Sequence, residues 1–197
     1  VRLPHLSNAT DFRLLTWAEW IDAPSDADYD FVVLPGTKST LDDLGWLHRT
    51  GVAAWIKDRY AAGATVVGVC GGFQMLGRCV ADPAGVESTT AIVEGLSLLP
   101  VETVMTAHKR TEAVRARLPG GGTTAVGAEP VEPFATLEDG STDGMRRPRL
   151  VGTYLHGALE DPAVCEHVFG VRPAGDLEQA CYGRLADWFE QHVRHLD

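Results

Sequence analysis

A short glycine-rich segment contains a cysteine at a position suited to nucleophilic chemistry. The segment reads Gly68-Val69-Cys70-Gly71-Gly72 and continues an apolar, β-branched run that begins at Thr65. A nucleophile on a sharp strand-to-helix turn has a strained backbone, and small residues two positions before and after it avoid collisions. The start of the following helix favours a thiolate, and the N–H of Gly71 would point toward the oxyanion of a tetrahedral intermediate. We predict that Cys70 is a nucleophile; a buried cysteine in a tight turn is the structural alternative.

A thiol nucleophile needs a base, and His156 is the candidate because it directly follows the strand-like run 150–155. It would emerge at the carboxyl edge of a sheet, within reach of Cys70. Spacing alone leaves the other six of the seven histidines as alternatives. The turn Pro35-Gly36-Thr37 ends a third apolar run, and its backbone N–H groups are candidates for a second oxyanion donor. A turn without a catalytic role is the alternative there.

The elements around these residues alternate between strand and helix. The runs 31–34 and 65–69 are short and continuously apolar, as expected of strands buried on both faces. A helix is expected to begin at Ser39 and Thr40, and a second is expected over 52–60. This order predicts an α/β fold with an open, mostly parallel sheet flanked by helices. Residues 100–148 are less regular, Gly120-Gly121-Gly122 reads as a loop, and the helical pattern is clearest over 177–196.

Composition excludes several classes of protein. The chain has 197 residues, 45% of them hydrophobic, and a formal charge of -10, which suits one domain over 1–197 that binds neither nucleic acid nor an anionic membrane. No apolar run approaches the roughly 18 residues of a membrane helix, and no signal peptide opens the chain. Cys79, Cys165 and Cys181 form no Cys-x-x-Cys pair, so we expect buried thiols in a reducing cytosol and no metal site.

Several segments spread along the chain form a recognisable set. They are Arg2–Phe12, Leu34–Thr40 with Asp43-Leu44 and Trp46-Leu47, Val69–Gly77, Asp82-Pro83, Gly85-Val86-Glu87, Gly95–Thr103 and Gly152–Gly157. Together these segments resemble the glutamine amidotransferase domain of cobyric acid synthases. The resemblance covers nearly the whole chain, and its segments are specific in combination.

The resemblance implies a class I amidotransferase of flavodoxin-like architecture. Such a domain hydrolyses glutamine through a cysteinyl thioester, with Cys70 as nucleophile, His156 as base, Gly36 and Gly71 at the oxyanion, and Gln74 at the substrate. The domain itself would need no cofactor and no metal. ATP and Mg would belong to a synthase domain that amidates corrinoid carboxylates, and no Gly-x-x-x-x-Gly-Lys-Ser/Thr loop for it is present here. The chain opens on Val1-Arg2-Leu3-Pro4 without Met, from which we expect an excised or truncated domain. The resemblance implies the C-terminal part of a longer, cytoplasmic synthase.

Two departures from the family pattern leave alternatives open. Most class I amidotransferases have a glutamate two residues after the histidine, where this chain has Ala158, so the group that orients His156 is not identified. Cobyric acid synthases share this absence. The family's Gly-Tyr-Glu-Ile-His segment is reduced here to Gly127-Ala128-Glu129-Pro130-Val131. A related amidotransferase subunit that acts with a Mur-ligase-like partner, and a domain that has lost catalysis, are the competing hypotheses.

Overall fold

The computed structural model describes residues 19–107, 113–118 and 131–170. The described residues up to His156 belong to one compact unit, and those from Gly157 onward belong to a second. No helix among them is both long enough and apolar enough to cross a membrane. The predictions for 2–12, 120–122, 127–130, Cys181 and 177–196 lie outside the described residues.

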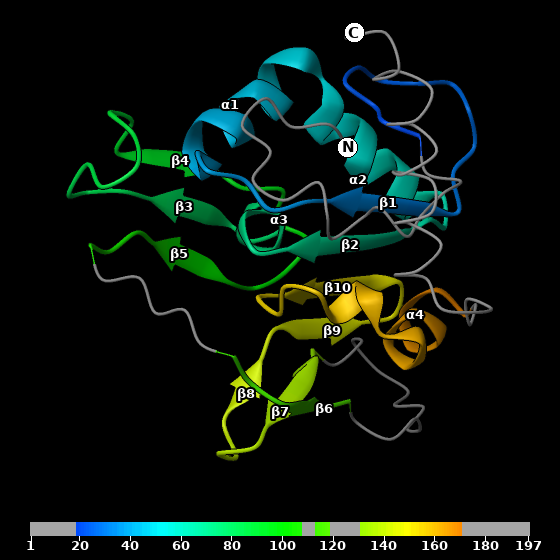
Figure 1. Cartoon of the computed structure of the whole chain (residues 1–197). Helices are drawn as coiled ribbons and strands as arrows, with labels where there is room; N and C mark the ends of the chain where they lie inside the picture. Colours follow the sequence, from blue (N-terminus) through cyan, green and yellow to red (C-terminus); the bar gives the residue numbers. More distant parts are fainter. Residues whose placement is uncertain (1–18, 108–112, 119–130, 171–197) are drawn as a thin grey trace, which may run out of the picture. The chain divides into compact units, whose positions relative to one another are not determined.

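The first unit is built on a sheet of four strands in the order β1-β2-β10-β9 (Figure 1). The strands β1, β2 and β10 run parallel, and β9 pairs antiparallel with β10. This confirms the predicted α/β class with a mostly parallel sheet. Both short apolar runs form strands, as expected; β2 is buried on both faces from Val66 to Val69, whereas Phe31 and Val33 of β1 are only partly buried. The strands are β1 (Phe31–Leu34), β2 (Thr65–Val69), β9 (Met145–Arg147) and β10 (Leu150–Thr153).

Two helices lie on one face of this sheet and provide much of the core (Figure 1). The helix α1 spans Thr40–Thr50 and α2 spans Val52–Ala61, close to the predicted ranges. Gly51 joins them with a φ of 80°, a left-handed conformation that glycine adopts at little cost. The core residues of this unit are Ile21, Val32, Leu34, Leu41, Leu44, Leu47, Val52, Ala53, Trp55, Ile56, Val66, Phe73, Met75, Leu76, Val80, Leu96, Leu98, Leu99 and Leu150.

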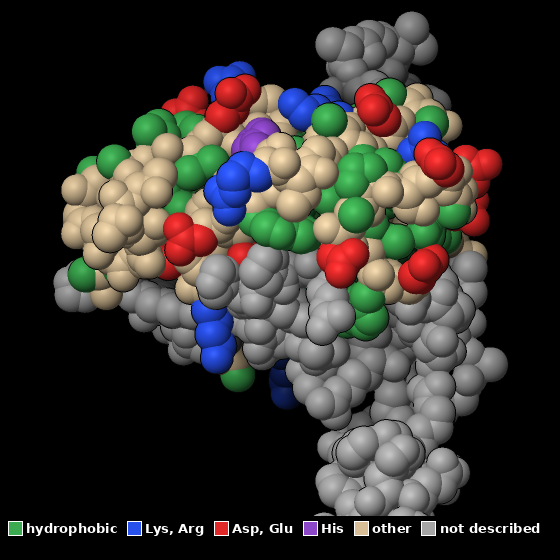
Figure 2. Space-filling model, turned by 90° about the horizontal axis from the view of Figure 1, so that it is seen from above, with side chains coloured by type: hydrophobic (Ala, Val, Ile, Leu, Met, Phe, Trp, Pro, Cys, Tyr) green, Lys and Arg blue, Asp and Glu red, His purple; other side chains and the backbone are tan. Residues whose placement is uncertain are grey.

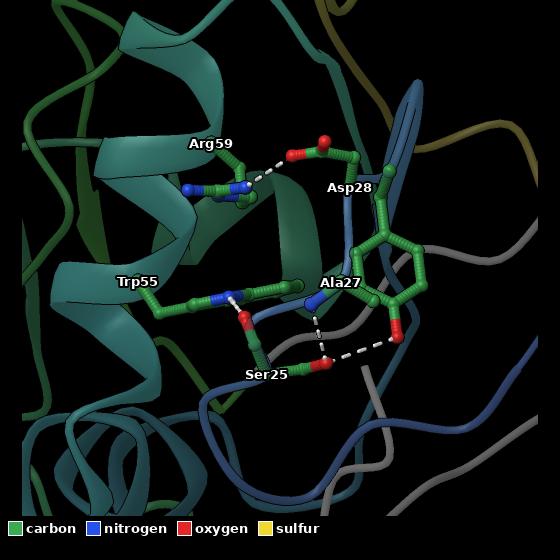
Figure 3. A network of polar contacts seen from close by, with 6 residues as sticks. Ser25, Ala27, Asp28, Trp55 and Arg59 are labelled. Carbon is green, nitrogen blue, oxygen red and sulfur yellow. Dashed lines mark hydrogen bonds and ion pairs between the residues drawn. The ribbon is translucent and has the colours of Figure 1, made fainter.

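The segment before β1 is fastened to α2 by polar contacts. The indole Nε1 of Trp55 donates a hydrogen bond of 2.8 Å to the carbonyl oxygen of Ser25, and Arg59 pairs with Asp28 at 3.2 Å (Figure 3). Because the segment is tied to the helix, β1 enters the sheet at a fixed position relative to α2.

Two further small sheets are built from short strands; β3 and β4 precede the irregular region 100–148, and β5 to β8 lie within it. Strands of two or three residues are too short to give a periodic signal, which is why they were not predicted. One sheet has the order β4-β3-β5, from β3 (Cys79–Ala81), β4 (Ile92–Glu94) and β5 (Glu102–Val104). The other has the order β6-β7-β8, from β6 (Ala116–Arg117), β7 (Ala135–Leu137) and β8 (Thr142–Asp143).

The described part of the surface seen in Figure 2 carries no block of a single charge. Across it, acidic and basic side chains are interspersed with hydrophobic ones.

The described part of the second unit contains the 3-10 turn η2 (Ala158–Glu160) and the helix α4 (Pro162–Phe169). Asp161 caps α4 by accepting a hydrogen bond of 2.7 Å from the N–H of Ala163. Cys165 is buried in this unit, as predicted, and its thiol donates to the carbonyl oxygen of Leu159. Cys79, in contrast to the prediction, is only partly buried, because it alternates along β3 with the fully buried Val80 and so faces the less buried side.

Candidate active site

Cys70 occupies a strained turn between β2 and the short helix α3 (Gly71–Met75). Its φ of 53° and ψ of -112° lie in a region that non-glycine residues rarely adopt. The N–H of Cys70 donates to the carbonyl oxygen of Thr153 at 2.8 Å, and its own carbonyl oxygen accepts from the N–H of Gln74 at 3.1 Å. The structure thus has the strand-to-helix turn expected at Cys70; its backbone is bonded to β10 and α3, and the residue is partly exposed.

The flanking glycines are required by close backbone approach. A Cβ on Gly68 would lie 2.7 Å from the carbonyl oxygen of Gly72, and one on Gly72 would lie 2.1 Å from that of Leu34. Contacts this short do not occur between real atoms of these types. The positions two before and two after Cys70 therefore admit no side chain without movement of the backbone, as the sequence pattern predicted.

The turn after β1 lies directly beside Gly71. A Cβ placed on Gly71 would lie 3.2 Å from the backbone nitrogen of Thr37, and Gly36 and Thr37 are both buried. The Thr37 hydroxyl donates to the carboxylate of Asp43 and accepts from the N–H of Ser39 at 3.1 Å, so α1 holds the turn in place. The structure therefore brings together the two backbone segments that were predicted to flank an oxyanion.

Gln74 connects the two sides of the nucleophile turn. Its Oε1 accepts a hydrogen bond of 3.2 Å from the hydroxyl of Thr40, and its Nε2 donates to the hydroxyl of Tyr154 at 3.5 Å. The Tyr154 ring packs edge-on against Phe73 with centroids 5.1 Å apart. Burial is the largest cause that raises the pKa of the Tyr154 phenol, and the nearby charge of Cys70 adds to it. Thr40 and Tyr154 were not singled out in the sequence, although Tyr154 lies in the same motif as His156.

Glu87 is a second residue that sequence reasoning left without a role. Its Oε1 is 3.5 Å from the hydroxyl of Thr40, and its Oε2 is buried without a hydrogen-bond partner among the described residues. Burial raises the pKa of Glu87. The turn that carries it is fixed by Asp82, whose carboxylate accepts from the N–H groups of Val86, Glu87 and Ser88 at 2.7 to 3.0 Å. These three bonds lower the pKa of Asp82.

His156 lies three residues beyond the end of β10 and is exposed. Because β10 pairs in parallel with β2, with Thr153 opposite Val69, the residues that follow both strands leave the sheet at the same carboxyl edge. Cys70 therefore directly follows β2, and His156 follows the neighbouring strand β10 at the same edge, as expected, but three residues after that strand ends rather than directly after it.

A buried carboxylate supports the segment that leads to His156. Asp143 is 9% exposed, and its carboxylate accepts hydrogen bonds from the hydroxyl of Thr153 and from the N–H of Tyr154 at 3.3 Å. The Thr153 hydroxyl also accepts from the N–H of Leu155 at 3.0 Å. Burial raises the pKa of Asp143. The sequence offered no indication of Asp143, since a single aspartate in an irregular region carries no local pattern.

Among the described residues, no group of three or more His, Cys, Asp or Glu side chains is arranged to hold a metal ion. The described site offers instead a thiol on a strained turn, neighbouring backbone amides, and an amide side chain beside them. Such an arrangement is suited to attack on a carbonyl or amide carbon.

Comparisons with known proteins show the family that the chain resembles. The model of the CobB/CobQ-like glutamine amidotransferase domain matches residues 1–164. The chain is similar to proteins named cobyric acid synthase, with 39% identity to that of Mycolicibacterium gilvum, covering 98% of this chain and 42% of the relative. It is 41% identical to that of Bacteroides fragilis, covering 100% of this chain and 45% of the relative. This chain thus spans less than half the length of these relatives.

A solved structure described as a glutamine amidotransferase has a similar fold. The superposition gives a TM-score of 0.57 and covers 82% of this chain and 91% of the other, at 16% sequence identity. At that identity the likeness supports the fold alone, which is the α/β fold that the sequence predicted.

Proposed function

The chain belongs to the CobB/CobQ-like glutamine amidotransferase family, and we propose that it hydrolyses glutamine with Cys70 as nucleophile and His156 as base. The observation that carries this proposal is the strained conformation of Cys70 beside the Gly36–Thr37 turn and at the same sheet edge as His156. A strained, partly exposed cysteine at such an edge is the arrangement of a nucleophile, whereas a structural cysteine is ordinarily buried.

The reaction begins when His156 accepts the proton of the Cys70 thiol and the sulfur attacks the side-chain amide carbon of glutamine. The carbonyl π electrons move to oxygen, and the resulting oxyanion lies against the backbone N–H groups of Gly36 and Gly71. The carbon–nitrogen bond then breaks, and the nitrogen takes the proton from His156 and leaves as ammonia. Water, deprotonated by His156, attacks the thioester, and glutamate leaves as Cys70 recovers its proton.

Gln74 is the proposed substrate-binding side chain. It is held at both ends, by the Thr40 hydroxyl on its carbonyl and by the Tyr154 hydroxyl on its amide. A side chain fixed in this way loses little further freedom when substrate binds, which favours orientation of the reacting amide.

The relatives support a proposal for the role of the whole protein. We propose one amidotransferase domain over residues 1–197 that passes ammonia to an ATP- and Mg-dependent synthase domain in the same or a partner chain. Support comes from the relatives named cobyric acid synthase, in which a region of comparable size occupies 42% to 45% of the length. The acceptor would be a corrinoid carboxylate, and the location cytoplasmic. The comparisons do not favour the Mur-ligase-associated alternative, and the intact Cys70 turn argues against a domain without catalysis.

The proposal is tested by glutamine hydrolysis, measured as glutamate release, with and without the synthase domain. We expect Cys70→Ser to abolish release and His156→Asn to reduce it by on the order of 100-fold or more, since general base catalysis contributes about that much. Cys79→Ser is the matched control, because Cys79 is a partly buried cysteine of β3 outside the proposed chemistry. Release that survives Cys70→Ser would overturn the proposal.

A further inference from the structure

The group that orients His156 is not supplied by the position two residues after it, because Ala158 has no side-chain acceptor. An exposed histidine that acts as a base still needs its segment held in one arrangement. The polar contacts of the strand that leads to His156 show what holds this segment.

Asp143 makes the contacts that fix the end of β10. Its Oδ2 accepts from the Thr153 hydroxyl, and both carboxylate oxygens lie 3.3 Å from the N–H of Tyr154. The Thr153 hydroxyl accepts in turn from the N–H of Leu155 at 3.0 Å. One carboxylate therefore determines the backbone of the residues immediately before His156.

The same strand end is connected to the nucleophile. The carbonyl oxygen of Thr153 accepts the 2.8 Å hydrogen bond from the N–H of Cys70. The next side chain, Tyr154, packs on Phe73 and accepts from Gln74. Thr153 thus contacts Asp143 through its side chain and Cys70 through its backbone.

We propose that Asp143 is a positioning residue for glutamine hydrolysis, which holds Thr153 and Tyr154 so that His156 and Cys70 keep their relative places at the sheet edge. This inference rests on the proposed function. It assigns to Asp143, acting through Thr153, the orienting role that Ala158 cannot perform.

The environment of Asp143 supports a specific role. Within the described residues the carboxylate makes no ion pair, and a buried carboxylate without a cation is costly unless its hydrogen bonds are good. Burial raises its pKa, and the bonds from Thr153 and Tyr154 act against that rise. The backbone reverses at Gly144, where φ is 64° and a Cβ would lie 2.2 Å from the carbonyl oxygen of Gly152, so the carboxylate is held close to β10.

The test compares four variants of the full chain joined to its synthase domain. Asp143→Asn leaves a single side-chain acceptor, and Thr153→Val removes the hydroxyl while keeping the shape of the side chain. Thr153→Ser keeps the hydroxyl and is the rescue variant. Asp139→Asn is the control, because Asp139 is an exposed carboxylate of the adjacent turn that accepts from Ser141. The readouts are kcat and KM for glutamine, and the rate of Cys70 alkylation by iodoacetamide as a function of pH.

We expect Asp143→Asn and Thr153→Val to lower kcat by on the order of 10-fold or more with little change in KM, as displaced catalytic groups do. In both variants the pH at which the alkylation rate of Cys70 rises should shift upward, because His156 is no longer held in position to accept the proton of the thiol. Thr153→Ser and Asp139→Asn should retain the wild-type kcat and alkylation profile.

Two results would overturn the positioning role. One is a wild-type kcat and alkylation profile in Thr153→Val, which decides the matter even where Asp143→Asn fails to fold. The other is an equal loss in Thr153→Ser and Thr153→Val, since the hydroxyl would then be irrelevant. Failure of the wild-type chain to hydrolyse glutamine would instead count against the proposed function, and the alkylation profiles would still report on Asp143.

Discussion

Replacement of Gly72 by alanine is expected to destabilise the protein at its nucleophile turn. The new Cβ would lie 2.1 Å from the carbonyl oxygen of Leu34 and 2.9 Å from the Leu34 Cβ. Because the nearest obstacle is the backbone of the buried Leu34, β1 and α3 would have to separate by about 1.3 Å or more to reach an ordinary contact of 3.4 Å. The Gly36–Thr37 turn, which follows β1, would move away from Gly71 with it.

The expected cost follows from opposing terms. Overpacking of this kind costs about 3 kcal/mol at the upper end of its usual range, because no flexible side chain can give way. Alanine regains about 1 kcal/mol over glycine within a helix. The free energy of unfolding should therefore fall by about 2 kcal/mol. For a chain of this size, that lowers Tm by about 4 to 8 °C.

Gly45→Ala is the matched control for this change. Gly45 is also a helical glycine, but a Cβ there would meet only the far end of the Arg49 side chain, at 3.1 Å. We expect the free energy of unfolding of Gly45→Ala to exceed that of the wild type by about 0.5 to 1 kcal/mol, because alanine has the higher helix propensity. Urea unfolding followed by circular dichroism measures both variants. A Gly72→Ala protein as stable as wild type would refute the inference that close backbone approach demands glycine at this position.

The remaining predictions concern pH. Burial raises the pKa of folded Glu87, so its contribution to stability is present below the ordinary pKa of 4.5 and is lost as pH rises through the folded value. As pH rises from 4 to 7, the stability of Glu87→Gln measured by urea unfolding should therefore increase relative to that of the wild type. A stability difference between the two proteins that does not change with pH would contradict the burial argument. The pKa of Asp82 is lowered from its ordinary value of 3.8 by the N–H groups it accepts from, so its contribution is present above that value and is lost as pH falls. Asp82→Asn should be less stable than the wild type at pH 7, and the difference in the free energy of unfolding should become smaller below pH 3.8. A difference that stays constant as pH falls would contradict a lowered pKa of Asp82.

The sheet and the nucleophile turn were predictable because their determinants are local. The runs 31–34 and 65–69 are continuously apolar, and the glycines around Cys70 report a backbone constraint directly in the sequence. Because β2 and β10 run parallel, the residues that follow them lie at the same sheet edge, which places His156 on the same edge as Cys70.

The supporting residues could not be predicted because their contacts are long-range. Thr40 meets Gln74 across 34 positions in the sequence, and Tyr154 meets it across 80. Asp143 lies on a strand of only two residues, which has no periodicity to detect. Single polar residues of this kind acquire meaning only when the fold brings their partners to them.

The measurement that tests the central claim most directly is covalent labelling by 6-diazo-5-oxo-norleucine, an electrophile that mimics glutamine, located by mass spectrometry. We predict one adduct on Cys70 that excess glutamine suppresses, that Cys70→Ser abolishes, and that Cys79→Ser leaves intact. The absence of any Cys70 adduct, even with the synthase domain present, would contradict a glutamine site at this cysteine and would favour a partner domain without catalysis.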